Sequence, residues 1–155
     1  MNKSTCTGCG FTAALLLLAL FGMAQVKNPV QWAFSSKMIN ATTYEIHITA
    51  SIENGWHIYS QTTPEGGPIP TSINYVKSPL FTLSGKAKEV GKLEKRNEPL
   101  FGLVVKQFSN NVDFVQVIKL RGKVNTTLMG SVKFMVCNDH ECLPPSKQTF
   151  SIALK

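Results

Sequence analysis

The feature that most restricts the fold is a succession of short segments rich in β-branched and aromatic residues, separated by turns. The first two, residues 30–39 and 43–52, alternate apolar and polar side chains in part, and the short turn Asn40-Ala41-Thr42 should join them as a hairpin. No stretch after residue 25 shows a period-3.6 pattern of helical length. The sequence therefore predicts an all-β domain, and the many short strands favour a β-sandwich. Further strands are expected at 56–60, 73–77, 81–83, 102–108, 112–120, 130–137 and 148–154.

The first segment indicates export rather than a part of the fold. Lys3 gives a basic start, residues 11–24 form a nearly unbroken apolar run, and Gly22-Met23-Ala24 supplies the small residues that a signal peptidase needs. The run is shorter than the roughly 20 residues that span a bilayer, so a retained membrane anchor is the weaker alternative. We expect a signal peptide at 1–24, cleaved near Ala24, and a mature periplasmic domain at 25–155. Cys6 and Cys9 would leave with the peptide.

The size and charge of the mature chain exclude several classes of function. About 130 residues remain, enough for one domain with its own core. The whole chain carries 16 Lys and Arg against 9 Asp and Glu, and loss of the signal segment leaves a net charge of about +6. The basic residues are spread without interleaved aromatic residues, so we expect no nucleic-acid partner. There is no Gly-rich phosphate loop, Ser nucleophile elbow or paired-His zinc motif, which leaves thiol chemistry without a metal or other cofactor.

Side chains capable of covalent chemistry crowd together at one place, Cys137-Asn138-Asp139-His140-Glu141-Cys142-Leu143-Pro144-Pro145. The preceding residues indicate a strand, and a four-residue loop between the cysteines would turn the chain back as a hairpin. Cα atoms that face each other across an antiparallel pair lie about 4.5 to 5.5 Å apart, which suits a disulfide. Pro144 and Pro145 lack a backbone N–H and should keep Cys142 out of a regular ladder.

Three interpretations of this cysteine pair stay open on the residues alone. The disulfide would close a loop of only about six residues, which contributes about 2 kcal/mol and suits a bond that is made and broken. The alternative is a local structural bond, which is common in oxidising compartments. A metal site of Cys137, Asp139, His140 and Cys142 is the weakest interpretation, because no second ligand pair has metal-like spacing. Protonated His140 would favour a thiolate, whereas Asp139 and Glu141 would oppose it.

These residues carry a resemblance to a known family. Residues 134–150, with the close cysteine pair, Leu143-Pro144-Pro145 and a final strand, resemble the amino-terminal periplasmic domain of the thiol:disulfide interchange protein DsbD. Gly55-Trp56-His57-Ile58-Tyr59 is similar to the aromatic strand motif of that domain. Four residues separate the cysteines here, where the best-known members have five. The resemblance implies an immunoglobulin-like β-sandwich and a thiol–disulfide exchange activity of the protein-disulfide reductase type, linked to cytochrome c biogenesis.

The resemblance also implies roles and partners. In the family the second cysteine forms the mixed disulfide with partners, so Cys142 is expected to do so here and Cys137 to resolve it. The implied partners are thioredoxin-like proteins and a membrane-embedded electron donor, which we expect on a separate chain because the sequence stops at Lys155. The alternative from another functional class is a secreted immunoglobulin-like binding or structural module with an inert disulfide.

A cap over the disulfide is a further expectation. Glu98-Pro99-Leu100-Phe101-Gly102 resembles the acidic, aromatic cap segment of the DsbD domain. Phe101 would then cover the sulfurs, Gly102 would permit a hinge, and Glu98 would hold or release a proton. The alternative is that Phe101 packs in the core.

Several other residues have expected positions. His57 and Tyr59 belong to the strand that packs near the redox pair in the family, so they are expected to line the site together with His140. Trp56 is expected in the core and His47 on a solvent face. The mixed-charge residues 92–99 are expected to form a solvated loop.

Overall fold

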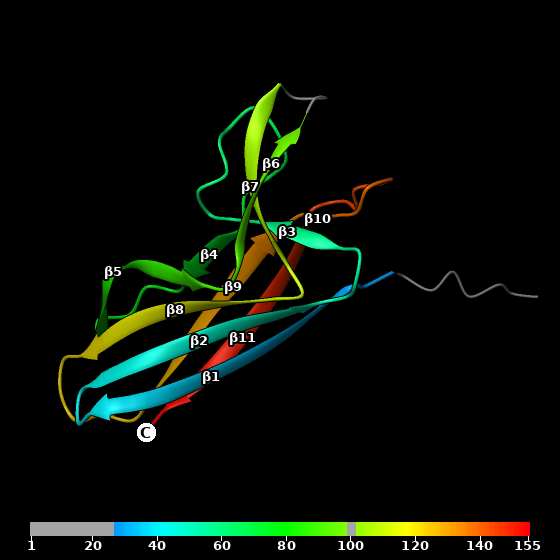
Figure 1. Ribbon diagram of the computed structural model, residues 1–155. Coiled ribbons are helices and arrows are strands. Elements are labelled where there is room, and N and C mark those ends of the chain that lie inside the picture. Colours follow the sequence, from blue (N-terminus) through cyan, green and yellow to red (C-terminus); the bar gives the residue numbers. More distant parts are fainter. Residues whose placement is uncertain (1–26, 99–101) are drawn as a thin grey trace, which may run out of the picture.

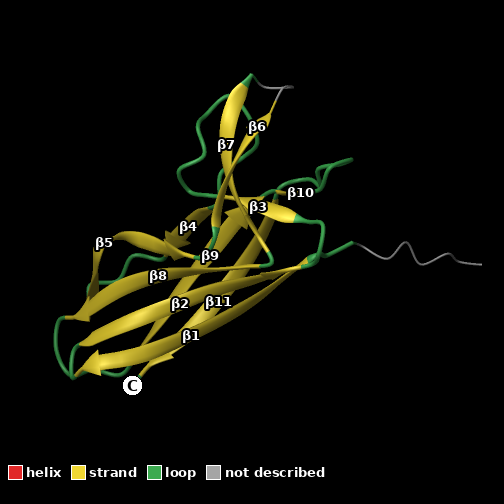
Figure 2. Ribbon diagram, viewed as in Figure 1, coloured by secondary structure: helices red, strands yellow, loops and turns green. Residues whose placement is uncertain are grey.

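The computed structural model describes residues 27–98 and 102–155, and every regular element in these two stretches is a β-strand (Figure 1, Figure 2). The prediction of an all-β domain is confirmed. No helix in the described part of the chain is long and apolar enough to cross a membrane. The strands are β1 Val30–Asn40, β2 Thr43–Ile52, β3 His57–Tyr59, β4 Ser72–Tyr75, β5 Phe81–Val90, β6 Leu93–Glu98, β7 Leu103–Ser109, β8 Asn111–Leu120, β9 Thr126–Phe134, β10 Val136–Cys137 and β11 Ser146–Leu154.

The strands form three antiparallel sheets. We call β1-β2-β8-β5 the front sheet, β11-β9-β4 the back sheet and β10-β3-β7-β6 the end sheet. In Figure 1 the back sheet crosses behind the front sheet, and β6 and β7 stand out from one end of the molecule as a hairpin. The front and back sheets approach each other at β1 and β11, where the Ser36 Oγ donates a hydrogen bond to the Ala153 carbonyl oxygen at 3.3 Å.

The front sheet shows the alternation of a half-buried strand. Ile46, Ile48 and Ala50 of β2 are fully buried, whereas the residues between them are partly exposed. His47 lies on the solvent side, as predicted, with its Nδ1 at 2.7 Å from the Oδ2 of Asp113 on β8. The predicted hairpin of β1 and β2 is confirmed, with Val30 opposite Ile52 at its open end.

Aromatic rings join the front and back sheets in the main core. Trp32 packs on Phe134 and Phe34 stacks on Phe150, each pair with ring centroids 5.1 Å apart. The back sheet is closely packed at Gly130, because a Cβ there would collide with the Phe150 ring and with the Asn74 carbonyl oxygen. A glycine is therefore required for the close approach of β4, β9 and β11.

The end sheet closes one end of the sandwich and gives the molecule two different faces there. Its inner face contributes Ile58, Phe108 and Val136 to the main core. Its outer face carries a second, smaller cluster of buried side chains that contains Tyr59, Val105 and Cys137. Cys137 thus lies on a sheet whose opposite face packs against the main core.

The predicted loop at residues 92–99 is wrong, because 93–98 form strand β6. This strand is a sheet edge in a protruding hairpin, and only Glu94 and Glu98 are even partly buried. Such a strand needs no apolar alternation, so its sequence carries no strand signal. Strand β5 is longer than the predicted 81–83 for a similar reason: most of it is exposed and its pairing with β8 shifts around Gly85, which has a φ of 71°.

Candidate redox site

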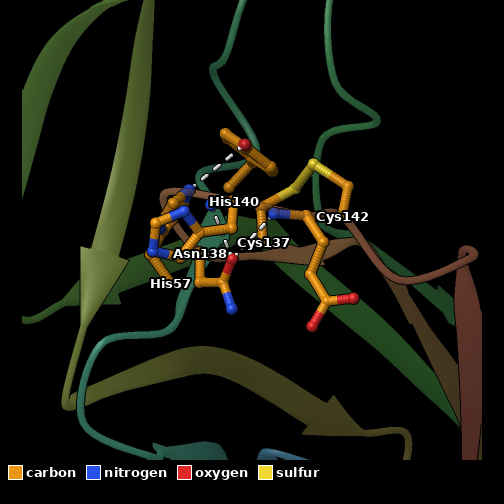
Figure 3. The surroundings of a disulfide bond; sticks show 7 residues. His57, Cys137, Asn138, His140 and Cys142 are labelled. Atoms are coloured by element: carbon orange, nitrogen blue, oxygen red, sulfur yellow. Dashed lines mark hydrogen bonds between the residues drawn. A yellow bond between two sulfur atoms is a disulfide. The ribbon is translucent and has the colours of Figure 1, made fainter.

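A tight hairpin loop brings the two cysteines together. Cys137 and Cys142 form an isolated antiparallel bridge, with Cα atoms 4.0 Å apart and a disulfide between their sulfurs. The Asn138 side-chain oxygen accepts hydrogen bonds from the backbone N–H groups of His140 and Glu141, both at 2.8 Å (Figure 3). An Asn side chain that satisfies backbone donors in this way stabilises a tight turn. The predicted hairpin between the cysteines is confirmed.

The two cysteines differ in their exposure to solvent. Cys137 is on β10 and only 1% exposed, within the cluster that also contains Tyr59 and Val105. Cys142 belongs to the exposed class and is followed by Leu143-Pro144-Pro145, of which both prolines are exposed. A reagent or protein that approaches from outside therefore meets Cys142 first.

Two ion pairs link the loop to distant parts of the chain. The Arg96 guanidinium on β6 lies 2.7 Å from the Asp139 carboxylate, and the Lys27 ammonium lies 2.9 Å from the Glu141 carboxylate. Lys27 also lies 4.5 Å above the centre of the Trp56 ring. The hydrogen bond from Arg96 lowers the pKa of the Asp139 carboxyl. Each loop carboxylate thus has a cationic partner. This weakens the effect that the sequence predicts for Asp139 and Glu141, namely that their negative charges oppose formation of a thiolate.

A polar hollow of about 260 Å³ opens beside the disulfide. Its walls come from the end sheet and the disulfide loop, since residues opposite each other in register share one face of a sheet. A larger hollow of about 430 Å³ between β4 and β5 is lined by other residues and contains no cysteine. The hollow beside the disulfide is lined by His57, Tyr59, Arg96, Glu98, Cys137, Asn138, Asp139, His140, Glu141 and Cys142.

His57 and Tyr59 form a pair within the hollow. The His57 Nε2 and the Tyr59 hydroxyl are 3.2 Å apart, and the two rings meet edge to face with centroids 5.3 Å apart. Burial lowers the pKa of His57, and the Arg96 charge lowers it further, whereas Asp139 and Glu94 act in the opposite direction. Burial and then the Glu98 charge raise the pKa of Tyr59 to about 12. Near neutral pH the site therefore holds a neutral imidazole and a protonated phenol.

Glu94 supports this face of the end sheet. Its Oε2 accepts a hydrogen bond from the Ser109 hydroxyl at 3.1 Å and one from the Gln107 amide at 3.4 Å. Ser109 is the register partner of His57 on β7. The carboxylate is thus held near enough to His57 for its charge to act on the imidazole.

The structure brings together six of the residues singled out in the sequence. Cys137, Cys142, His57, Tyr59, Glu98 and His140 all line the hollow. Trp56 is 6% exposed and belongs to the main core, as predicted. Phe101, the expected cap residue, lies outside the described residues together with Pro99 and Leu100, so the cap stays a prediction. Gly102 follows directly, with a φ of 63° and its N–H bonded to the Glu98 carbonyl oxygen at 2.9 Å.

Four residues of the site were not found by reasoning from the sequence: Lys27, Glu94, Arg96 and Asn138. Asn138 has a local signal, because an Asn directly after a strand favours a turn. Lys27, Glu94 and Arg96 depend on pairings between distant parts of the chain, which the sequence pattern does not contain. For the metal interpretation, the two sulfurs are bonded to each other, and no group of three or more His, Cys, Asp or Glu in 27–98 and 102–155 is arranged to hold a metal ion.

A β-sandwich with a disulfide hairpin at one end, with one cysteine buried and the other exposed, defines a class of domain suited to thiol–disulfide exchange. The model of the family "Thiol:disulfide interchange protein DsbD, N-terminal" matches residues 25–154, and the chain belongs to this family. The family acts in thiol–disulfide exchange. The predicted resemblance is therefore confirmed. No curated protein matches the chain in sequence.

Solved structures share the fold. The N-terminal periplasmic domain of ScsB from Proteus mirabilis matches with a TM-score of 0.52 and 17% identity, over 83% of this chain and 47% of that chain. This chain thus spans about half the length of that structure. The complex between the DsbD and PilB N-terminal domains from Neisseria meningitidis matches with a TM-score of 0.51 and 11% identity, over 82% of this chain and 87% of that one. The predicted fold class, an all-β, immunoglobulin-like β-sandwich, is confirmed.

Proposed function

We propose that the chain is a periplasmic thiol–disulfide exchange module that passes electrons between thioredoxin-like partners through a reversible Cys137–Cys142 disulfide. The observation that carries this proposal is the difference between the two cysteines, with Cys142 exposed and Cys137 only 1% exposed, in a loop beside a polar hollow. A structural disulfide needs no such asymmetry. Exchange does, because one sulfur must be attacked from outside and the other must leave and return.

The exchange has two steps. A partner thiolate attacks the exposed Cys142 sulfur, which breaks the Cys137–Cys142 bond, forms a mixed disulfide and releases Cys137 as a thiolate that takes a proton. The second cysteine thiol of the same partner then attacks the partner's sulfur in the mixed disulfide. This forms the partner's own disulfide and releases Cys142 as a thiol. Two electrons pass from the partner dithiol to the domain, and the reverse sequence returns them to another disulfide. No metal or organic cofactor enters these steps.

The partners and the compartment belong to the same proposal. Membership of the family supports thioredoxin-like partners and an electron donor in the membrane. The likeness to a periplasmic domain supports export, with a signal peptide at residues 1–24. Mass spectrometry of the exported protein should then find a chain that begins at or near Gln25, whereas a membrane-bound chain that retains Met1 would contradict this.

Single cysteine variants test the assignment of the two sulfurs. The probe is a thioredoxin whose second active-site cysteine is replaced by serine and whose first carries a thionitrobenzoate leaving group. Cys137→Ser should displace the leaving group quickly and give a covalent complex through Cys142, whereas Cys142→Ser should react slowly because Cys137 is buried. Equal trapping by both variants, or by neither, would count against the proposed roles. The alternative, an inert local disulfide, predicts that neither variant traps the probe.

A further inference from the structure

The exchange proposed above requires a proton acceptor for the buried cysteine. When a reduced domain passes electrons on, Cys142 attacks the partner disulfide first, and Cys137 must then attack Cys142 to release the partner. Only a thiolate can make that attack, and a thiol in apolar surroundings ionises reluctantly. Cys137 is 1% exposed and its cluster is completed by Leu103, Val105 and Met135. Some neighbouring group has to take its proton, and solvent does not reach it readily.

His57 is the neighbour in position to do this. Cys137 and His57 are direct register partners in the antiparallel pair of β10 and β3. Side chains in that relation share one face of the sheet with Cβ atoms about 4.5 to 5.5 Å apart. Both side chains are buried, and both line the hollow beside the disulfide.

The surroundings of His57 suit a base that works near neutral pH. The Tyr59 hydroxyl holds the ring at Nε2, at 3.2 Å. The charged groups that face it are Arg96 and Glu94 from β6 and Asp139 from the loop, and Glu98 lies further along the same wall. Burial and Arg96 keep the pKa of the imidazole low, so the ring is free to accept a proton. The carboxylates of Glu94 and Asp139 are near enough to stabilise the imidazolium once it forms.

We propose that His57 accepts the proton of the Cys137 thiol as Cys137 attacks Cys142, and returns a proton to the Cys137 thiolate in the opposite direction of exchange. In the forward step the S–H bond of Cys137 breaks, the imidazole becomes imidazolium, and the thiolate forms the intramolecular disulfide while the partner thiolate leaves. The imidazolium then gives its proton to solvent through the hollow. His140, also in the hollow, is exposed and on the loop rather than opposite Cys137.

The test uses the reduced wild-type domain and 5,5′-dithiobis-(2-nitrobenzoate), a disulfide that releases a coloured thiolate. The attack of Cys142 on the probe should release one equivalent of the coloured thiolate, at a rate that depends on probe concentration. The attack of Cys137 on Cys142 is intramolecular, so it should release a second equivalent at a rate that does not depend on probe concentration. Mass spectrometry should find the intramolecular disulfide as the product. With enough probe to make the first step fast, His57→Gln should slow the second step at least about tenfold near pH 7 and leave the first unchanged.

The pH profile separates a proton acceptor from a merely structural residue. In the wild type the rate of the second step should be nearly constant between about pH 7 and 8, because the imidazole already takes the proton. In His57→Gln the rate should rise about tenfold per pH unit, because the thiol must ionise by itself. His47→Gln is the matched control, since His47 lies on the front sheet with Asp113, and it should behave as the wild type.

Two outcomes would overturn the proposal. A flat profile in His57→Gln would show that His57 takes no proton, and a flat profile lost in Glu98→Gln but kept in His57→Gln would assign the role to Glu98. Failure of the proposed function itself would appear separately: a Cys137→Ser variant would then release no coloured thiolate in the first step, the attack of Cys142 on the probe.

Discussion

Reduction of the Cys137–Cys142 disulfide should lower the free energy of unfolding by only about 2 kcal/mol and leave the domain folded. The cysteines are five positions apart, so the bond closes a loop of six residues counting both ends. In the chain-entropy model such a loop contributes about 2 kcal/mol at 25 °C, against about 4.7 kcal/mol for a hundred-residue loop. The main core also excludes Cys137, which belongs to the smaller cluster. Domains of this size have about 5 to 15 kcal/mol of stability, so the reduced form should keep its fold.

Guanidinium unfolding of the oxidised and reduced domain measures this difference, with the fluorescence of Trp32 and Trp56 as the signal. By linkage, the same 2 kcal/mol makes the disulfide about 40 mV harder to reduce in the folded than in the unfolded chain. A double variant without Cys137 and Cys142 is the control, and reductant should not move its midpoint. A reduced domain that is unfolded without denaturant, or a loss above about 5 kcal/mol, would show that the bond is a structural staple and refute the reasoning.

Two further predictions concern the fold and its pH dependence. Gly130→Ala should destabilise the domain by about 1 to 3 kcal/mol in urea melts, because the added Cβ would meet the Phe150 ring. Gly122→Ala is the control and should not destabilise the domain, because a Cβ at Gly122 has nothing within 4 Å. Equal effects of the two substitutions would show that the back sheet is not tightly packed at Gly130. Because the pKa of Tyr59 is raised from 10.0 to about 12, its protonated phenol contributes stability that is complete below pH 10 and lost as the pH rises through 12. Tyr59→Phe should remove that part of the alkaline loss in unfolding experiments, and an unchanged alkaline profile would contradict the assignment.

Local patterns in the sequence were sufficient to predict much of the fold. The hairpin of β1 and β2 follows from alternation and a short turn, and the sequence range 43–52 coincides with β2. The cysteine hairpin follows from a strand, a four-residue spacing and two prolines. These features are visible because their cause is local: one face of a strand meets the core, or a turn needs particular residues.

The rest could not be predicted because its cause is not local. Strand β6 has no buried apolar face, and only its pairing with β7 makes it a strand. Arg96 reaches the site because it stands opposite Val105 in that pairing, and His57 lies beside Cys137 because β3 happens to be the neighbour of β10. Sequence reasoning placed His57 near the site through the resemblance, but the direct register with Cys137 comes from the structure.

The reduction potential of the Cys137–Cys142 pair tests the central claim most directly. The mature domain is equilibrated with thiol–disulfide buffers of known potential, and the fraction reduced is read by mass after alkylation. A reversible exchange disulfide should be half reduced between about −180 and −270 mV. A bond that is reduced only below about −300 mV would be a structural disulfide, and the chain would then be an immunoglobulin-like module without a role in electron transfer.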